Sequence, residues 1–332
     1  MSIKIGSLPP EQQAIKDRCF HPTGTFIEFK KEEIEQSIPD RFEQMVHLYS
    51  DRLAVKTRNH QITYDELNKD GNRVAHAIIA ERGDEPEPVG RLFTNGASLM
   101  AAILGVLKAG KYFVLLDPSF PKTRIGAVLD DSQAGLVVTD QQNVSIARDV
   151  VGSSCRLIEF EAIDSDLPIE NLGLFISPSA HAVCLYTSGS TGQPKGVIQN
   201  HRNLLQGIML YTDEYHVCAE DRIILLTSGT CNTVAYIFTA LLNGAALLPF
   251  DVRKEGVSRL ASWLLQEKIS ICCISSPLFR NLCGTLTGEE RFHDLRLLGL
   301  KSEAVYKTDF DLYNKYFSPD CVMTNGLACT EA

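Results

Sequence analysis

The sequence predicts an α/β protein with two tandem, mostly parallel sheets covered by helices. From about Asp51 onward, apolar runs of strand length alternate with segments of helical period that open with Asp, Ser, Asn or Pro. This alternation is typical of βα units, whose strands pair in parallel and whose helices cover the sheet. The length of 332 residues exceeds the usual single domain of roughly 100–200 residues, which leaves room for two such units.

The expected elements follow this alternation along the chain. Strands are expected at residues 53–58, 89–94, 112–117, 135–140, 181–188, 222–228, 245–251, 269–275, 295–302 and 321–325. Helices are expected at residues 63–83, 98–110, 202–215, 257–268 and 305–317. Pro168 and Pro178 interrupt the rhythm, so we expect two subdomains of about 41–160 and 175–332. Residues 1–40 are expected to form an arm lying across the body.

Charge and composition exclude several classes of protein. The net charge of −9 is spread along the chain, and no run of Lys or Arg marks a surface for nucleic acid. The N-terminus lacks the apolar core of a signal peptide, and the most apolar stretches are too short to cross a bilayer. We therefore expect a cytoplasmic protein with neither nucleic acid nor a membrane as a partner. The ten cysteines show no C-x-x-C spacing and are expected to be reduced and mostly buried.

The most informative stretch is residues 185–197, a strand that ends in a loop of hydroxyls and glycines with one lysine. Glycines let backbone N–H groups approach a polyphosphate, hydroxyls donate further hydrogen bonds, and the lysine adds positive charge. The residues expected to bind phosphate are Thr187, Ser188, Gly189, Ser190, Thr191, Gly192 and Lys195.

Two other interpretations of this loop fit less well. A Walker-type P-loop fails because Pro194 stands at its second glycine and Gly196 stands where the magnesium-binding hydroxyl belongs. A flexible surface turn explains the composition, but it does not explain the ordered run of hydroxyls and glycines followed by Pro194 and Lys195.

Residues 186–196, YTSGSTGQPKG, resemble the signature loop of the adenylate-forming superfamily, which includes acyl-CoA synthetases and nonribosomal peptide synthetase adenylation domains. Residues 62–67 and 107–118 resemble two further family elements, in the family's order, and favour the peptide-synthetase branch. The resemblance implies that residues 41–332 are an incomplete AMP-binding domain with the fold of the family's large N-terminal domain, the C-terminal domain being absent.

The resemblance also implies a nucleotide site. Residues 298–305 and 325–331 resemble the family segments that flank adenine and the phosphates. Carried over, the adenine site comprises Glu303, Ala304, Asn325 and Leu327. Thr330 would contact the α-phosphate, and Glu331 would hold Mg²⁺, which prefers carboxylate and phosphate oxygens. Thr187, Lys195 and Glu331 are the expected catalytic residues, with ATP and Mg²⁺ as cofactors.

The chain departs from the family pattern around this site. Lys301 and Ser302 replace glycines, and Leu327 replaces the aromatic residue that stacks on adenine, so ATP affinity is expected to be weaker. Cys231 replaces the aspartate that pairs with an amino-acid substrate's ammonium. Because burying an unpaired charge costs several kcal/mol, an ordinary α-amino acid is disfavoured relative to a keto, hydroxy, aryl or fatty acid. The expected substrate pocket comprises Cys231, Asn232, Ala235, Gly299, Lys301 and Gly326.

The resemblance implies an activity and two alternatives. The implied activity is formation of an acyl-adenylate from a carboxylic acid, followed by acyl transfer to the phosphopantetheine thiol of a carrier protein or to CoA. The family's C-terminal lysine is not found in the sequence, so little turnover is expected from the chain alone. The alternatives are an inactive module that binds a nucleotide or a partner, and one half of a split enzyme completed by a separate C-terminal fragment.

Overall fold

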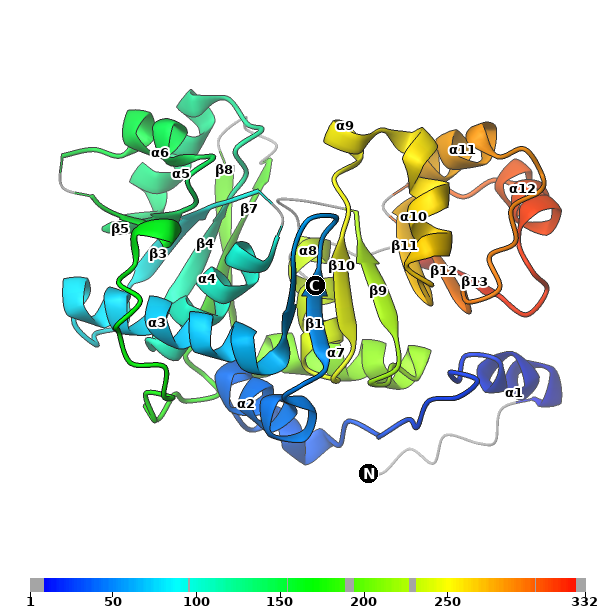
Figure 1. Ribbon diagram of the computed structural model, residues 1–332, viewed down its shortest axis with the longest axis horizontal. Coiled ribbons are helices and arrows are strands. Elements are labelled where there is room, and N and C mark those ends of the chain that lie inside the picture. The colour runs from blue at the N-terminus through cyan, green and yellow to red at the C-terminus, as the bar shows by residue number, and fades with distance from the viewer. Residues whose placement is uncertain are drawn as a thin grey trace.

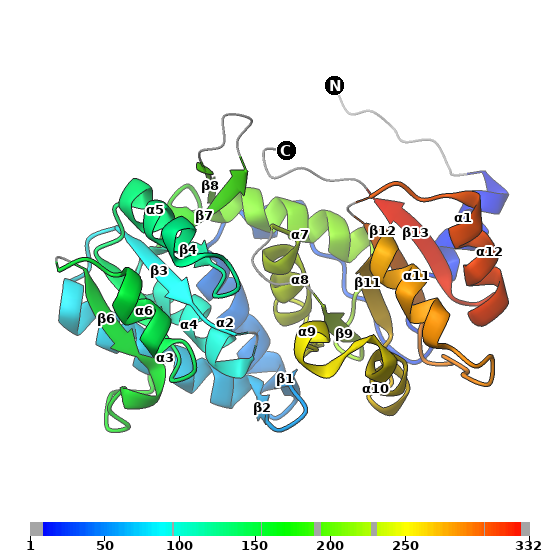
Figure 2. The same cartoon turned by 90° about the horizontal axis from the view of Figure 1, so that it is seen from above.

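Figure 1 shows the computed structural model, which describes residues 9–94, 96–153, 155–188, 194–226, 231–301 and 303–326. Two sheets stand side by side, and helices lie between them and on their outer faces (Figures 1 and 2). The expected fold class is therefore confirmed.

The six-stranded sheet has the order β6-β5-β3-β4-β7-β8. Its strands are β3 (Pro88–Leu92), β4 (Tyr112–Leu116), β5 (Leu136–Thr139), β6 (Arg156–Glu159), β7 (His181–Ser188) and β8 (Pro194–Asn200). All neighbours pair in parallel except β7 and β8, which form an antiparallel hairpin at one edge.

The seven-stranded sheet has the order β13-β12-β11-β9-β10-β1-β2. Its strands are β1 (Leu53–Lys56), β2 (Gln61–Thr63), β9 (Arg222–Leu225), β10 (Ala246–Pro249), β11 (Ile271–Ser275), β12 (Leu297–Lys301) and β13 (Val322–Gly326). Only β1 and β2 pair antiparallel.

Three layers of helix enclose the two sheets. The middle layer comprises α2 (Ile38–Tyr49), α3 (Tyr64–Arg82), α4 (Ala97–Lys108), α7 (His201–Tyr215) and α8 (Cys231–Leu241). The outer layers are α5 (Lys122–Ser132) with α6 (Val144–Val150), and α10 (Leu260–Gln266), α11 (Ser276–Thr285) and α12 (Lys307–Tyr316). Two short helices, α1 (Pro10–Asp17) and α9 (Val252–Glu255), lie outside these layers.

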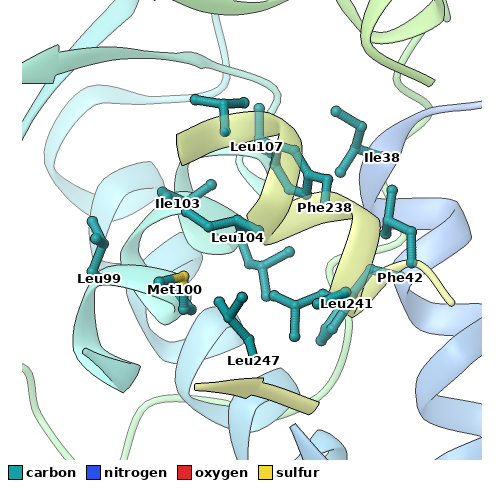
Figure 3. Packing of buried hydrophobic residues seen from close by; sticks show 14 of the residues in the cluster. Ile38, Phe42, Leu99, Met100, Ile103, Leu104, Leu107, Phe238, Leu241 and Leu247 are labelled. Carbon is teal, nitrogen blue, oxygen red and sulfur yellow. The ribbon is translucent and has the colours of Figure 1, made fainter. Parts of the chain in front are cut away.

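The largest hydrophobic core fills the middle layer and contacts both sheets. Figure 3 shows part of it, where side chains of α4 and α8 meet Ile38 and Phe42 of α2 and Leu247 of β10. The helices α3 and α4 approach closely at Gly105, because a Cβ there would lie 2.5 Å from Val74 Cβ. This shared core joins the two sheets into one unit.

Each sheet contains strands from both sides of the division that the sequence predicts between residues 160 and 175. Strands β1 and β2 belong to the seven-stranded sheet, whose other strands begin at Arg222, and β7 and β8 belong to the six-stranded sheet. The subdomain boundaries stay a prediction. All ten expected strands are present within the described residues, whereas β2, β6 and β8 were not expected. Each of these three is an edge strand, where the apolar signal is weak.

The segment before α2 lies along the seven-stranded sheet. Arg18 Nη1 donates to the Pro319 carbonyl at 2.8 Å, and the Phe20 ring stacks on His216 with centroids 3.7 Å apart. The eight cysteines whose side chains are described are free, and all but Cys155 are buried. None of the helices in the described ranges is long and apolar enough to span a membrane.

Candidate nucleotide and substrate site

The β7 and β8 strands flank the segment that is expected to bind phosphate. Thr187 lies opposite Lys195, and Ser188 lies opposite Pro194 in the last pair of the ladder. Thr187 is half-buried and Lys195 is exposed. Gly189, Ser190, Thr191 and Gly192, which would complete the loop, lie outside the described residues. The hairpin thus brings the two predicted ends of the loop, Thr187 and Lys195, together on adjacent strands.

The base of the hairpin is tightly packed. A Cβ added at Gly196 would lie 3.0 Å from Cys184 Sγ and 3.2 Å from Tyr186 Cζ, which leaves little room for a larger residue. The Tyr186 hydroxyl donates to Asp131 Oδ2 at 2.6 Å, and burial with this bond raises the pKa of Tyr186. Burial also raises the pKa of Cys184 to about 11. Among the described residues of β7 and β8, Lys195 is the side chain that is charged at every physiological pH.

The segment expected to face adenine follows β12. The Ser276 hydroxyl donates to the Glu303 carbonyl at 3.5 Å, and Arg280 Nη2 donates to the Ala304 carbonyl at 3.3 Å. These bonds tie the backbone of residues 303–304 to α11, while the side chains of Glu303 and Ala304 are exposed. Asn325 is exposed on β13, opposite Leu300. Leu327, Thr330 and Glu331 lie outside the described residues.

Alternation along the strands separates the seven-stranded sheet into two faces. Cys273 of β11 lies opposite Gly299 of β12, which lies opposite Thr324 of β13. Lys301 and Gly326 form the next pair on the same face. This face packs against the middle helix layer, because Cys273 and Leu297 share a core with residues of α7 and α8. Three residues of the expected substrate pocket, Gly299, Lys301 and Gly326, therefore lie together.

The Lys301 side chain lies among tyrosines from α7. Its Nζ donates to Tyr215 Oη at 3.0 Å and lies 5.6 Å from the ring centroids of both Tyr211 and Tyr215. Its aliphatic part covers Gly326, where an added Cβ would lie 3.0 Å from Lys301 Cδ. Within the described residues, Lys301 forms no ion pair with a carboxylate. We call Tyr211, Tyr215, Cys273, Gly299, Lys301 and Gly326 the Lys301 cluster.

The tyrosines and the thiol around Lys301 are held in their neutral forms by burial. Burial raises the pKa of Tyr215. Burial likewise raises the pKa of the Tyr236 hydroxyl and of the Cys273 thiol. The Lys301 ammonium therefore lies among neutral tyrosines, and the Glu214 carboxylate acts on the same tyrosines from α7.

Sequence reasoning missed the residues that surround this lysine. Tyr211 and Tyr215 are separated by one helical turn and so lie on the same face of α7, a spacing visible in the sequence. The period of two in β11 and β13 shows which residues share a face with Cys273 and with Thr324. Only the strand register, which comes from the structure, places these two residues beside Gly299.

The remaining expected pocket residues belong to α8. Ala235 is half-buried on this helix. Cys231 and Asn232 stand at its first two positions, and their side chains lie outside the described part of the chain. The interpretation of Cys231 as a replacement for an ammonium-binding aspartate therefore stays a prediction.

A cleft of about 640 Å³ opens between the carboxyl ends of the two sheets. It is lined by segments that follow β3, β4, β9 and β10, among them Thr94, Pro118, Leu226 and Phe250. Ligands of open α/β sheets bind at this end of the strands, where loops and helix starts converge. The cleft therefore lies on the side of the molecule expected to carry the chemistry.

A family model for AMP-binding enzymes matches residues 42–332. The chain is 32% identical to gramicidin S synthase 2 of Brevibacillus brevis, covering 89% of this chain and 6% of that protein. It is 31% identical to tyrocidine synthase 1 of Brevibacillus parabrevis, covering 79% of this chain and 24% of that protein. The chain spans only a small part of the length of these relatives.

Two solved structures share the fold. The nonribosomal peptide synthetase FmoA3 superposes with a TM-score of 0.82 at 19% identity, covering 97% of this chain and 34% of that chain. The N-terminal subdomain of Klebsiella oxytoca NpsA superposes with a TM-score of 0.77 at 22% identity, covering 90% of this chain and 75% of that chain. With a family model that matches nearly the whole chain and a fold shared with these proteins, the chain belongs to the AMP-binding enzyme family.

Proposed function

We propose that this chain binds ATP and activates a carboxylic acid by adenylation. A carboxylate oxygen attacks the α-phosphorus, the bond to pyrophosphate breaks, and an acyl-adenylate forms. A thiol of a carrier-protein phosphopantetheine or of CoA then attacks the acyl carbon, AMP leaves, and a thioester forms. The observation that carries this proposal is the hydroxyl and glycine loop, whose flanking residues Thr187 and Lys195 are paired by the hairpin.

The nucleotide fits the residues that flank the loop. Lys195 is exposed beside a neutral strand pair, so its charge is available to phosphate oxygens. Solved structures of similar fold include FmoA3 in an AMPPNP-bound form and the NpsA N-terminal subdomain in complex with 3-hydroxybenzoyl-AMSN. In this chain, Mg²⁺ would be held by Glu331 and would neutralise phosphate charge.

The acid is proposed to lack an α-ammonium group. Cys231 supplies no negative charge, and Lys301 brings a positive charge to the expected substrate pocket. A substrate ammonium would therefore be unpaired and repelled. The cleft between the sheets is large enough to admit the thiol arm of the acyl acceptor.

A nucleotide-holding module without turnover is the second candidate. It is favoured by Lys301, whose side chain covers Gly326 next to the expected adenine wall. ATP–pyrophosphate exchange distinguishes the two candidates, because a module that only binds nucleotide returns no label to ATP.

Calorimetry with AMP and with ATP plus Mg²⁺ tests the nucleotide site. We expect millimolar or tighter binding by the chain, and about tenfold weaker ATP binding by Lys195→Ala, because a charge-assisted hydrogen bond contributes roughly 1.5–3 kcal/mol. The matched control is Lys315→Ala, an exposed lysine on α12 that contacts only Tyr316 among aromatic rings. No heat of binding from a folded sample would refute the proposal.

A further inference from the structure

We propose that Lys301 recognises a second carboxylate on the substrate, so that the acid activated at this site is a dicarboxylic acid. This inference rests on the proposed function and names the substrate class of the same site. It is carried by the position, surroundings and unmatched charge of Lys301.

Lys301 differs from the buried lysines Lys108 and Lys111, because no carboxylate of the described residues pairs with its ammonium. Lys108 is buried and forms an ion pair with Glu43, and Lys111 is buried and lies 3.3 Å from Glu87 Oε1. Lys301 is half-buried, yet the described residues offer its ammonium only the Tyr215 hydroxyl and two tyrosine rings. An ammonium has three N–H donors, so two remain for water or for a ligand.

The position of Lys301 matches a place that a substrate would reach. It ends β12 and pairs with Gly326, and the preceding residue, Leu300, pairs with Asn325 of the expected adenine site. Neighbouring strands are about 4.8 Å apart. Lys301 therefore lies one strand spacing from β13, which carries Asn325 of the expected adenine site. An acyl group joined to the α-phosphate could extend from there along the sheet face toward Lys301.

The surroundings of Lys301 favour a carboxylate over an uncharged acceptor. Tyr211, Tyr215 and Tyr236 are neutral, and they reduce the water that would otherwise screen the ammonium. In such an environment an opposite charge is attracted more strongly than in bulk water. Because residue 326 is a glycine, the Lys301 side chain lies over it, and Lys301 Nζ is the atom nearest to a Cβ added there. A keto, hydroxyl or phenol oxygen would accept a hydrogen bond but would leave the charge uncompensated.

The test is calorimetric binding of matched acyl sulfamoyladenosines, stable mimics of an acyl-adenylate, to the chain. The series has an ω-carboxylate on four-, five- and six-carbon acyl groups, each paired with its methyl-terminated counterpart of equal length. We expect at least one carboxylate-bearing compound to bind about tenfold or more tightly than its counterpart, as a charge-assisted hydrogen bond implies. Lys301→Met should abolish this preference, and Lys301→Arg should retain part of it.

Controls separate the inference from the proposed function. Lys315→Met removes an exposed lysine and should leave the preference unchanged. The circular dichroism spectrum and the urea midpoint of Lys301→Met show whether the variant is folded, and AMP binding by the chain reports on the nucleotide site separately. If AMP and all analogues fail to bind, the proposed function fails. If analogues bind but no carboxylate is preferred, or if the preference survives in Lys301→Met, only the dicarboxylic acid is refuted. A stronger preference for keto, hydroxyl or phenol analogues would also overturn it.

Discussion

Each sheet buries an arginine, and the two differ in how their charge is compensated. In the seven-stranded sheet, Arg296 donates to both carboxylate oxygens of Asp221 at 2.9 and 2.6 Å and to three backbone carbonyls, including that of Tyr215. In the six-stranded sheet, Arg91 is 2% exposed, and its Nε and Nη2 make no hydrogen bond within the described residues.

The two arginines therefore differ in how many hydrogen bonds compensate their buried charge. Arg296 joins β12 to the loops before β9 and to the Cys19 carbonyl of the N-terminal segment, so several distant segments depend on it. Burial lowers the pKa of Arg91 to about 9, although Asp117 acts in the opposite direction. Buried polar groups stabilise a fold when they are fully satisfied and cost free energy when they are not. We therefore expect the two arginines to respond differently to mutation.

The largest expected effect is on the satisfied arginine. Asp221→Ala leaves Arg296 buried without its carboxylate, and we expect a loss of about 3–5 kcal/mol in the free energy of unfolding. Urea denaturation followed by circular dichroism measures it. The control is Asp149→Ala, which breaks the exposed pair with Lys122 at 2.6 Å and should cost under about 1 kcal/mol. Equal losses for both variants would contradict the comparison.

A second prediction concerns a buried neutral base in the middle layer, between the sheets. His201 is 1% exposed, its Nδ1 accepts a hydrogen bond from the Ile38 N–H at 3.1 Å, and burial lowers its pKa from 6.5 to about 4. The unfolded chain therefore binds a proton at a higher pH than the folded one. The stability contributed by neutral His201 is complete above pH 6.5 and is lost as the pH falls toward 4.

Between pH 7 and pH 5 this loss should reach about 2 kcal/mol. His201→Asn, whose side-chain oxygen can accept the same bond, should show a shallower fall in stability over this interval. Urea midpoints at pH 7, 6 and 5 for both proteins provide the measurement. Parallel curves would mean that His201 does not carry this pH dependence.

The unsatisfied arginine should give a much smaller effect. Arg91→Met keeps an unbranched side chain beside Phe113 and removes a buried charge, so the free energy of unfolding should change by less than about 1 kcal/mol, or rise. Arg296→Met, measured in the same urea series, should lose several times as much. A large loss for Arg91→Met would show that its guanidinium has a partner as important as Asp221.

The smallest expected effect on stability is at Gly326. An added methyl group meets only the flexible end of Lys301, so Gly326→Ala should change the free energy of unfolding by about 0.5 kcal/mol or less. The displaced lysine should nevertheless weaken binding of carboxylate-bearing analogues while AMP binding is retained. A fall in AMP affinity as large as that for the analogues would place the effect in the nucleotide site instead.

The fold class could be predicted from the sequence because its signals are local, and the phosphate loop, which rests on an equally local pattern, stays a prediction. Residues 186–196 are contiguous, and the βα alternation repeats within each strand and helix. The pairing of β1 with β10 could not be predicted, since it depends on contacts between distant segments. The same reason explains why the tyrosine neighbours of Lys301 were missed. Those neighbours come from α7, about 85 residues earlier in the chain.

The exchange of strands between the sheets has a consequence for synthesis of the protein on the ribosome. Val55 of β1 pairs with Leu247 of β10, which is made roughly 190 residues later, or about 10–40 s at 5–20 residues per second. During that interval β1 has no partner on its β10 side, and its apolar residues Ala54 and Val55 lack the core that later buries them completely. Slowing elongation before Ala246 would lengthen the interval in which this edge of β1 lacks its partner strand.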